Sequence, residues 1–464
     1  MQVPVAGLDR RFENRWSCPS VIAELPLLAG WSAIGIGAAL DNGIYYPSYV
    51  VIMTIGVLLI LTTLALRPNF GRFTSHHGGI AVGTVVLTAI VLPASTYATV
   101  NSYATGQAIH ASRLLTIAAA LLLATWSVFS LPRAIWAAYS VILFMLAAGV
   151  TQIVASHAPP IDVWYMLQAT THALGHDQNI YTVPWSSGIP GELSNKYVYL
   201  PGATILLWPF HAIFGDVRYG LLAALIITGI ALIRAGTQSA ITLTAALFVL
   251  YPKVMYGLEQ SWIDPLTLCA LSLMGLAMMR GRRGWAIVAF AVALSCKQYN
   301  WLIIPFAVLW KDFGFRRTAI AVAAAVGLSL PWALVNIHAF ISGVITYNLD
   351  LPLRTDSLSL YTTLVLHQEN PGLELPAAVI TAVFLLAIWR LPRTETGFFL
   401  GSAAIIGVYD LFNRLSFFDA WEFAGGLTLF AVIFGRATSD SERSRRTPVL
   451  DASAHLSDQH PADG

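Results

Sequence analysis

Long apolar runs recur along this sequence and decide what it can fold into. Many of them approach the roughly 20 apolar residues that a helix needs to cross the hydrocarbon core of a bilayer. Charged residues make up 11% of the 464 residues, whereas soluble domains carry about 25%. In lipid every backbone polar group needs a partner within the protein, so such runs cross as helices. The sequence therefore predicts an all-α, polytopic membrane protein of about 13–14 membrane segments.

Basic residues orient the first part of the chain. Arg67, Arg72 and Arg133 fall in alternate joining segments, and joining segments rich in Lys and Arg stay in the cytoplasm. This alternation places the polar segment 157–201 on the non-cytoplasmic face, with the plasma membrane as the expected location. The net charge is only +2 and the basic residues lie between spans, so we expect no nucleic-acid partner. The first five runs fall at about 21–40, 49–66, 80–99, 113–131 and 134–156.

The alternation fails in the second half of the chain. If every run crossed once, the basic segment RGRRG at 280–284 would lie outside, against the positive-inside bias. The run 284–310 has basic residues at both ends, so we expect a hairpin of two half-length helices that turns at Lys297. The run 201–214 is too short to cross easily and is expected to be tilted or re-entrant. Whether every run crosses once or 284–310 forms this hairpin, the segments 157–201 and 338–372 lie on the same outer face.

These boundaries divide the chain into four parts. They are a cytoplasmic N-terminus at 1–20, an N-terminal transmembrane bundle at 21–133, a core at 134–435 that carries the two outer loops, and a tail at 436–464. The run 21–40 follows three arginines and is typical of a signal anchor. The tail is polar and charged, and is expected to be disordered in the cytoplasm. The cysteines, Cys18, Cys269 and Cys296, lack metal-ligand spacing and are assigned to no disulfide.

The segment 157–201 is far longer than the about four to six residues that usually join two elements. We interpret it as a catalytic loop. Asp162 stands near its start, and two roles for it can hold together: a helix N-cap, which Asp favours, or a general base at the membrane surface. The helix that follows is expected to lie in the interface with Trp164, Leu167 and Leu174 toward lipid.

Further polar residues interrupt the apolar runs. Glu259, Gln260 and Asp264 stand at the mouth of a run, where they are either solvated or line a cavity. Thirteen residues separate Lys297 from the nearest flanking arginine, so it lies too far from an interface for its amine to snorkel there. A phosphate or carboxylate partner explains a cation at that depth better.

The second outer loop contains a single basic residue. This is Arg354, flanked by Asp350 and Asp356, and it suits either bidentate phosphate binding or a surface ion pair. His172 and His176 have the spacing of a metal pair on a helix, but no third ligand follows at a suitable distance. We therefore expect no metal.

In their order along the chain, these motifs resemble the GT-C membrane glycosyltransferases, especially the polyprenol-phosphate-mannose-dependent α-mannosyltransferases of glycosyltransferase family 87. The resemblance spans about residues 134–440. The first outer loop matches at Asp162, Tyr165, Gly175 through Ile180-Tyr181, and Tyr199-Leu200-Pro201. The later matches are Glu259-Gln260 (with Glu for the family's Gly), Ser295-Cys296-Lys297 with Pro305, and Arg354-Thr355-Asp356-Ser357-Leu358.

The resemblance implies a GT-C-like fold and an inverting transfer of a sugar, mannose first, from a polyprenyl-phosphate donor to a lipid- or glycan-linked acceptor on the outer face. It implies no metal or other cofactor. Asp162 would take the acceptor's proton, and Lys297 and Arg354 would stabilise the charge that builds on the phosphate. The candidate substrate-binding residues are Tyr165, His176, Tyr181, Tyr199, Glu259, Gln260, Asp264, Lys297, Gln298, Arg354 and Asp356.

Two other functions fit part of this pattern. A secondary transporter or lipid flippase also has many spans and intramembrane charges, but does not require a long outer loop that opens with Asp162. A polymerase or ligase of surface glycans shares lipid-linked substrates and large outer loops. The chain also departs from the family in having four spans before the one that leads into the catalytic loop, where about one is usual.

Overall fold

The computed structural model describes residues 24–40, 46–66, 82–83, 85–86, 103–129, 133–189, 193–236, 239–369, 372 and 374–457, and only the backbone of 439–457. In these residues every regular element is a helix, and strand-like pairing is limited to one bridge between Ser186 and Ser194. The predicted all-α class is confirmed. The segment 1–20, including Cys18, and most of the run 80–99 lie outside the described residues.

Six helices in the described ranges are long and apolar enough to cross a bilayer, which confirms a polytopic membrane protein. The full number of membrane segments stays a prediction, because several shorter apolar helices accompany the long ones. The long helices are α3 (Pro47–Ala65), α6 (Gly106–Val128), α7 (Ala134–Ala155), α16 (Gly314–Val335), α21 (Glu395–Phe412) and the first half of α22 (Phe418–Ser457). The shorter ones include α2 (Glu24–Leu40), α11 (Ser239–Val249), α13 (Asp264–Met279) and α20 (Glu374–Arg390).

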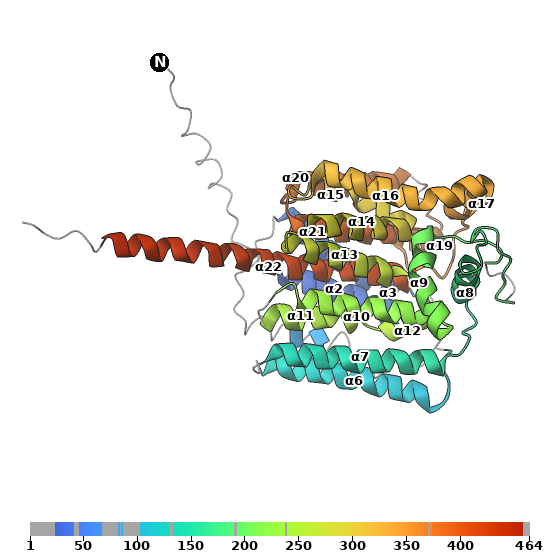
Figure 1. Cartoon of the computed structure of the whole chain (residues 1–464), viewed down its shortest axis with the longest axis horizontal. Helices are drawn as coiled ribbons and strands as arrows, with labels where there is room; N and C mark the ends of the chain where they lie inside the picture. Colours follow the sequence, from blue (N-terminus) through green and yellow to red (C-terminus); the bar gives the residue numbers. More distant parts are fainter. Residues whose placement is uncertain are drawn as a thin grey trace, which may run out of the picture.

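The helices lie side by side in one bundle (Figure 1). α21 and α22 form its centre, where 83% and 94% of their most apolar windows are buried, against 17% for α16 at the rim. The N-terminal helices α2 and α3 share a hydrophobic core with these central helices. Trp31 of α2, for example, packs edge-on against Tyr251, with 5.8 Å between ring centroids. The spans before the expected core thus cover the central pair.

The run 201–214 does not continue straight into the next helix. The helix axis bends by 114° between α9 (Pro201–Phe214) and α10 (Arg218–Ile233). Arg218 holds the bend: its buried guanidinium pairs with Asp216 at 2.6 Å and donates to the carbonyl of Ser156, at the end of α7, at 2.9 Å. The expected departure from a straight crossing is confirmed.

The run 284–310 folds back on itself at Lys297, as expected. α14 (Arg283–Cys296) ends there, Lys297 is extended, and the chain continues as the 3-10 helix η2 (Gln298–Ile303) and α15 (Ile304–Leu309). Asn300 Nδ2 donates to the carbonyl of Ala293 at 2.7 Å, so the second leg turns back along the first. α14 is about 20 Å long at about 1.5 Å per residue, shorter than the roughly 30 Å hydrocarbon core. The turn is therefore recessed.

The C-terminal tail differs from the sequence expectation. We expected disorder from 436, but α22 continues as a helix to Ser457 and projects from the end of the bundle away from α8 (Asp162–Leu174) (Figure 1). The physical reason is cooperativity, since residues that extend a formed helix do not meet the cost of nucleating a new one. Residues 458–464 lie outside the described ranges.

Candidate active site

The two segments expected on the outer face meet at one end of the bundle (Figure 1). The second segment contains α17 (Ile337–Ile341), the π-helix η3 (Ser342–Thr346), α18 (Tyr347–Asp350) and α19 (Leu360–Leu366). Tyr181 packs edge-on against Phe340, with 5.0 Å between ring centroids. Gln298, at the hairpin turn, donates to the carbonyls of Val198 at 2.7 Å and Val344 at 3.0 Å. The turn therefore lies beneath both segments and ties them together.

Asp162 is the first residue of α8 rather than its N-cap, which is Ile161. Asp162 Oδ1 accepts from the backbone N–H of Val163 at 2.7 Å. The N-cap prediction is wrong by one position because the chain enters the helix only after the extended Ile161. The placement of Leu167 toward lipid is also wrong, since α8 lies against α9 and buries that side chain. Gln168 fixes this packing through its bond to the carbonyl of Gly215 at 2.9 Å.

The carboxylate of Asp162 lies in a partly desolvated junction. Burial raises its pKa above the ordinary range for Asp, and the N–H groups of Val163 and Leu193 and the charge of Arg354 act in the opposite direction. Arg354 is anchored by Asp356, which accepts from its Nε at 2.9 Å and its Nη2 at 2.6 Å. A carboxylate and a guanidinium from two distant segments thus share one electrostatic environment at the mouth of the bundle.

Tyr199 links this junction to the hairpin turn. It is within electrostatic range of Asp162 and also of the charges around Lys297. The Lys297 amine lies 5.8 Å from the centroid of the Tyr199 ring. Tyr181, which is buried, donates its hydroxyl hydrogen to the Tyr199 carbonyl at 2.9 Å. Tyr181 therefore holds the backbone of Tyr199 in place.

Lys297 has two carboxylate partners. Its Nζ lies 2.9 Å from Asp264 Oδ2 and 2.8 Å from Asp419 Oδ2, and the Tyr299 hydroxyl donates to the other oxygen of Asp264. The three charged side chains, which we call the Lys297 triad, are 12%, 0% and 14% exposed, in the order Lys297, Asp264 and Asp419. One positive charge faces two negative charges. The sequence allowed phosphate or carboxylate as the partner, and the structure supplies carboxylates.

Sequence reasoning missed several of these residues. Asp419 and Glu422 open α22, and Asp410 lies in α21. Asp419 belongs to the Lys297 triad, and Glu422 and Asp410 are electrostatically coupled to it. Both carboxylate oxygens of Asp410 are buried and have no hydrogen-bond partner in the described residues. The available signal was a carboxylate inside each of the last two apolar runs, which the rule for intramembrane charges marks as unusual.

The structure does not bring every candidate to this group. His176 stacks on His172 with 4.2 Å between ring centroids, just beyond the end of α8. That is about 20 Å from Asp162 along the helix at about 1.5 Å per residue. Tyr165 packs edge-on against Trp164 one turn from Asp162. Glu259 and Gln260 are buried at the end of α12 (Val254–Glu259), just before Asp264 begins α13.

The described residues contain no group of three or more His, Cys, Asp or Glu side chains arranged to hold a metal ion. Comparison of the chain with protein-family models, curated proteins and solved structures found no match. The arrangement of the site therefore carries the functional argument on its own.

Proposed function

We propose that this protein is a GT-C-like inverting glycosyltransferase. In this proposal it transfers a sugar, mannose first, from a polyprenyl-phosphate donor to a lipid- or glycan-linked acceptor on the non-cytoplasmic face of the plasma membrane. The observation that carries the proposal is the junction of Asp162 and Arg354. A partly desolvated carboxylate lies within electrostatic range of a guanidinium that Asp356 anchors, where two long loops meet at the end of an apolar bundle.

The chemistry follows from these two groups. Asp162 accepts the proton of the acceptor hydroxyl while that oxygen forms a bond to the anomeric carbon. The bond between the anomeric carbon and the phosphate oxygen breaks on the opposite face, and polyprenyl phosphate leaves with the electron pair. The configuration at the carbon is inverted. Arg354 stabilises the charge that builds on the phosphate through charge-assisted hydrogen bonds.

The Lys297 triad fits a positioning role within this proposal. Its lysine is balanced by Asp264 and Asp419, so it offers a phosphate less net positive charge than an unpaired lysine would. The triad instead holds in place the recessed turn, which includes Gln298 and lies beside the Tyr199 ring. Arg354 is paired with one carboxylate, Asp356, rather than two, so we assign the phosphate contact primarily to Arg354.

The test is release of polyprenyl phosphate by the purified protein in lipid nanodiscs. A panel of radiolabelled polyprenyl-phosphate sugars is supplied with membrane extracts as acceptors, and release should depend on both donor and acceptor. Arg354→Gln should lower the rate, whereas Lys196→Gln, which removes an exposed charge from the first outer loop, should not. The proposal fails if no donor in the panel yields acceptor-dependent release.

Proton-coupled transport is the second candidate, and Asp410 is the observation that favours it. A buried carboxylate without a hydrogen-bond partner, near two other acids and one lysine, is a pattern found in proton-coupled carriers. A carrier would move substrate across proteoliposomes in response to a pH gradient without breaking a covalent bond, and Asp410→Asn would abolish that flux. A glycan polymerase or ligase would share the transfer chemistry, and the size of the acceptor would identify it.

A further inference from the structure

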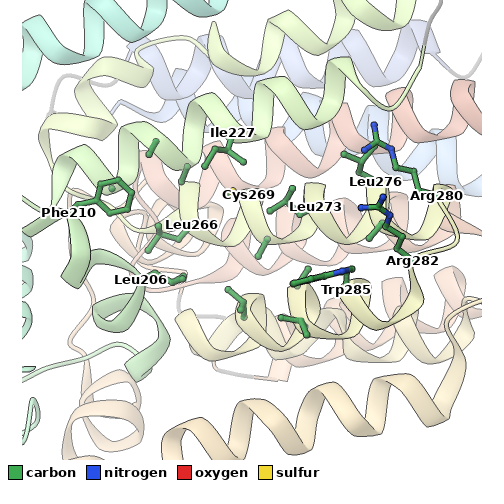
Figure 2. A pocket seen from close by; sticks show the side chains of 18 residues that line it. Leu206, Phe210, Ile227, Leu266, Cys269, Leu273, Leu276, Arg280, Arg282 and Trp285 are labelled. Carbon is green, nitrogen blue, oxygen red and sulfur yellow. The ribbon is translucent and has the colours of Figure 1, made fainter. Parts of the chain in front are cut away.

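A cavity of about 480 Å³ lies away from the candidate active site, between α10, α13 and α14 (Figure 2). α9 closes one end with Leu206 and Phe210, and the walls are almost entirely aliphatic, as at Leu273. At the other end stand Arg280 and Arg282 (Figure 2). The cavity is therefore long and apolar, with positive charge confined to one end.

The walls of this cavity reach the outside of the bundle. Ile227, Leu273, Trp285 and Val288 line it and are 43%, 39%, 67% and 52% exposed. In a membrane protein, apolar side chains at the rim of a bundle face lipid rather than water. An apolar chain can therefore enter the cavity sideways from the bilayer.

The basic end lacks an internal partner. Arg280 and Arg282 are exposed, and neither forms an ion pair or a side-chain hydrogen bond within the described part of the chain. No carboxylate is among the lining residues. Guanidinium groups bind phosphate through paired, charge-assisted hydrogen bonds. Trp285 beside them is of the type that anchors at the level of lipid headgroups.

We propose that this cavity binds an anionic phospholipid, with its phosphate on Arg280 and Arg282 and an acyl chain along α10, α13 and α14. Basic pockets between transmembrane helices are known to select anionic headgroups on the side of the membrane that carries the positive residues. The basic end lies a full α13 helix, about 24 Å at about 1.5 Å per residue, from Asp264. The proposal therefore does not depend on the proposed transferase activity.

The proposal has a structural consequence. The lipid would bridge α13, which begins at Asp264, and α14, which ends at the residue before Lys297. A lipid held there should stabilise the packing of α13 against α14. Thermal unfolding in detergent should then move to higher temperature with phosphatidylglycerol but not with phosphatidylcholine of the same chains.

Binding is measured on the full chain by native mass spectrometry with each of those two lipids. The wild type should retain phosphatidylglycerol, and Arg280→Gln with Arg282→Gln should weaken that binding about tenfold or more. The matched control is Arg283→Gln with Arg316→Gln, which removes the same charge from exposed residues that do not line the cavity. It should bind like the wild type.

A variant that fills the cavity distinguishes lipid binding inside it from a general attraction of anionic lipid to the positively charged surface. Ala277→Phe adds a ring inside the cavity without changing charge, and it should reduce retention of phosphatidylglycerol. The proposal is overturned if the wild type retains both lipids equally, if the control pair loses as much binding as the Arg280 and Arg282 pair, or if Ala277→Phe has no effect. The exposed arginines are tolerant sites, and thermal unfolding of each variant without lipid checks that the fold is intact.

Discussion

Removing the charge of Lys297 should destabilise the fold strongly. Lys297→Met keeps an unbranched side chain close to the length of the lysine stem and leaves Asp264 and Asp419 facing each other without a cation. Their side chains are only 0% and 14% exposed, so water replaces little of what is lost. The two carboxylates would then repel one another inside the bundle.

The magnitude follows from the distances. At 2.9 and 2.8 Å, each attraction is about 6 kcal/mol gross with an effective dielectric constant of about 20. Desolvation of the lysine and mutual repulsion of the carboxylates reduce the net value. Removing one partner of a buried pair typically costs about 3–5 kcal/mol. We expect Lys297→Met to lose free energy of unfolding in that range.

The assay is urea unfolding in detergent micelles, followed by tryptophan fluorescence. Lys311→Met is the control, because Lys311 is exposed just after α15 and should cost no more than about 0.5 kcal/mol. The triple variant Lys297→Met, Asp264→Asn, Asp419→Asn removes all three charges. It should recover most of the loss, since replacing a whole buried ionic group by neutral residues is often close to neutral.

Two results would refute this reasoning. If Lys297→Met unfolds at the same urea concentration as Lys311→Met, the triad does not contribute to the fold. If the triple variant is no more stable than the single one, the loss comes from packing of the lysine stem rather than from unpaired charge.

Three further predictions concern the candidate site. Gly343 lies against the carbonyl of Tyr197, so Gly343→Ala should separate the two outer segments and lower both transferase activity and stability. Gly327→Ala, in open space on α16, should leave activity unchanged and should not lower stability, because Ala favours a helix interior over Gly; equal effects of the two changes would contradict the close approach. Single cysteines introduced at the exposed Ser186 and Asp350 of an otherwise cysteine-free chain should react with an impermeant reagent in intact cells, and protection of either one until lysis would contradict a shared outer face. Burial raises the pKa of Asp162, so the base should become protonated at a pH above the ordinary Asp pKa of about 3.9. As pH is lowered, kcat/KM should therefore begin to decline while the pH is still above that value. A decline only below that value would contradict the desolvated junction.

The broken elements of the fold could be predicted because charge marks where the chain must turn. Basic residues at both ends of 284–310 implied a hairpin, and the short run at 201–214 implied a bend; the structure contains both. Local pattern was enough in each case. The residues at which helices begin and end were predicted less well: the start of α8 differs from the prediction by one residue at Asp162, and α22 continues into the tail.

Pairings between distant segments could not be predicted in this way. Lys297 bonds to Asp419, 122 positions away, and that contact depends on how α22 packs across the hairpin turn. Arg218 likewise reaches Ser156, 62 positions away, to hold the bend between α9 and α10. A single sequence shows that such charges need partners, but the packing of the helices determines which partners they find.

Substitution of Asp162 by Asn has two separable consequences. The amide oxygen can still accept from the N–H of Val163, so the start of α8 should be preserved. Because the folded state raises the pKa of Asp162, this carboxyl group contributes stability that is fully present below its unfolded pKa and is lost as pH rises through the folded pKa. At neutral pH the variant should therefore be at least as stable as the wild type.

The most direct test of the account is the turnover of Asp162→Asn in the polyprenyl phosphate release assay. Loss of a general base costs about 10²–10⁴-fold in rate, or about 3–5 kcal/mol of barrier. The matched control is Asp177→Asn, since Asp177 is exposed beyond the end of α8 and its left-handed backbone suits Asn. We expect Asp177→Asn to turn over at the wild-type rate and Asp162→Asn to fall by that factor while still folded. Turnover of folded Asp162→Asn within a few-fold of the wild type would contradict the assignment of Asp162 as the base.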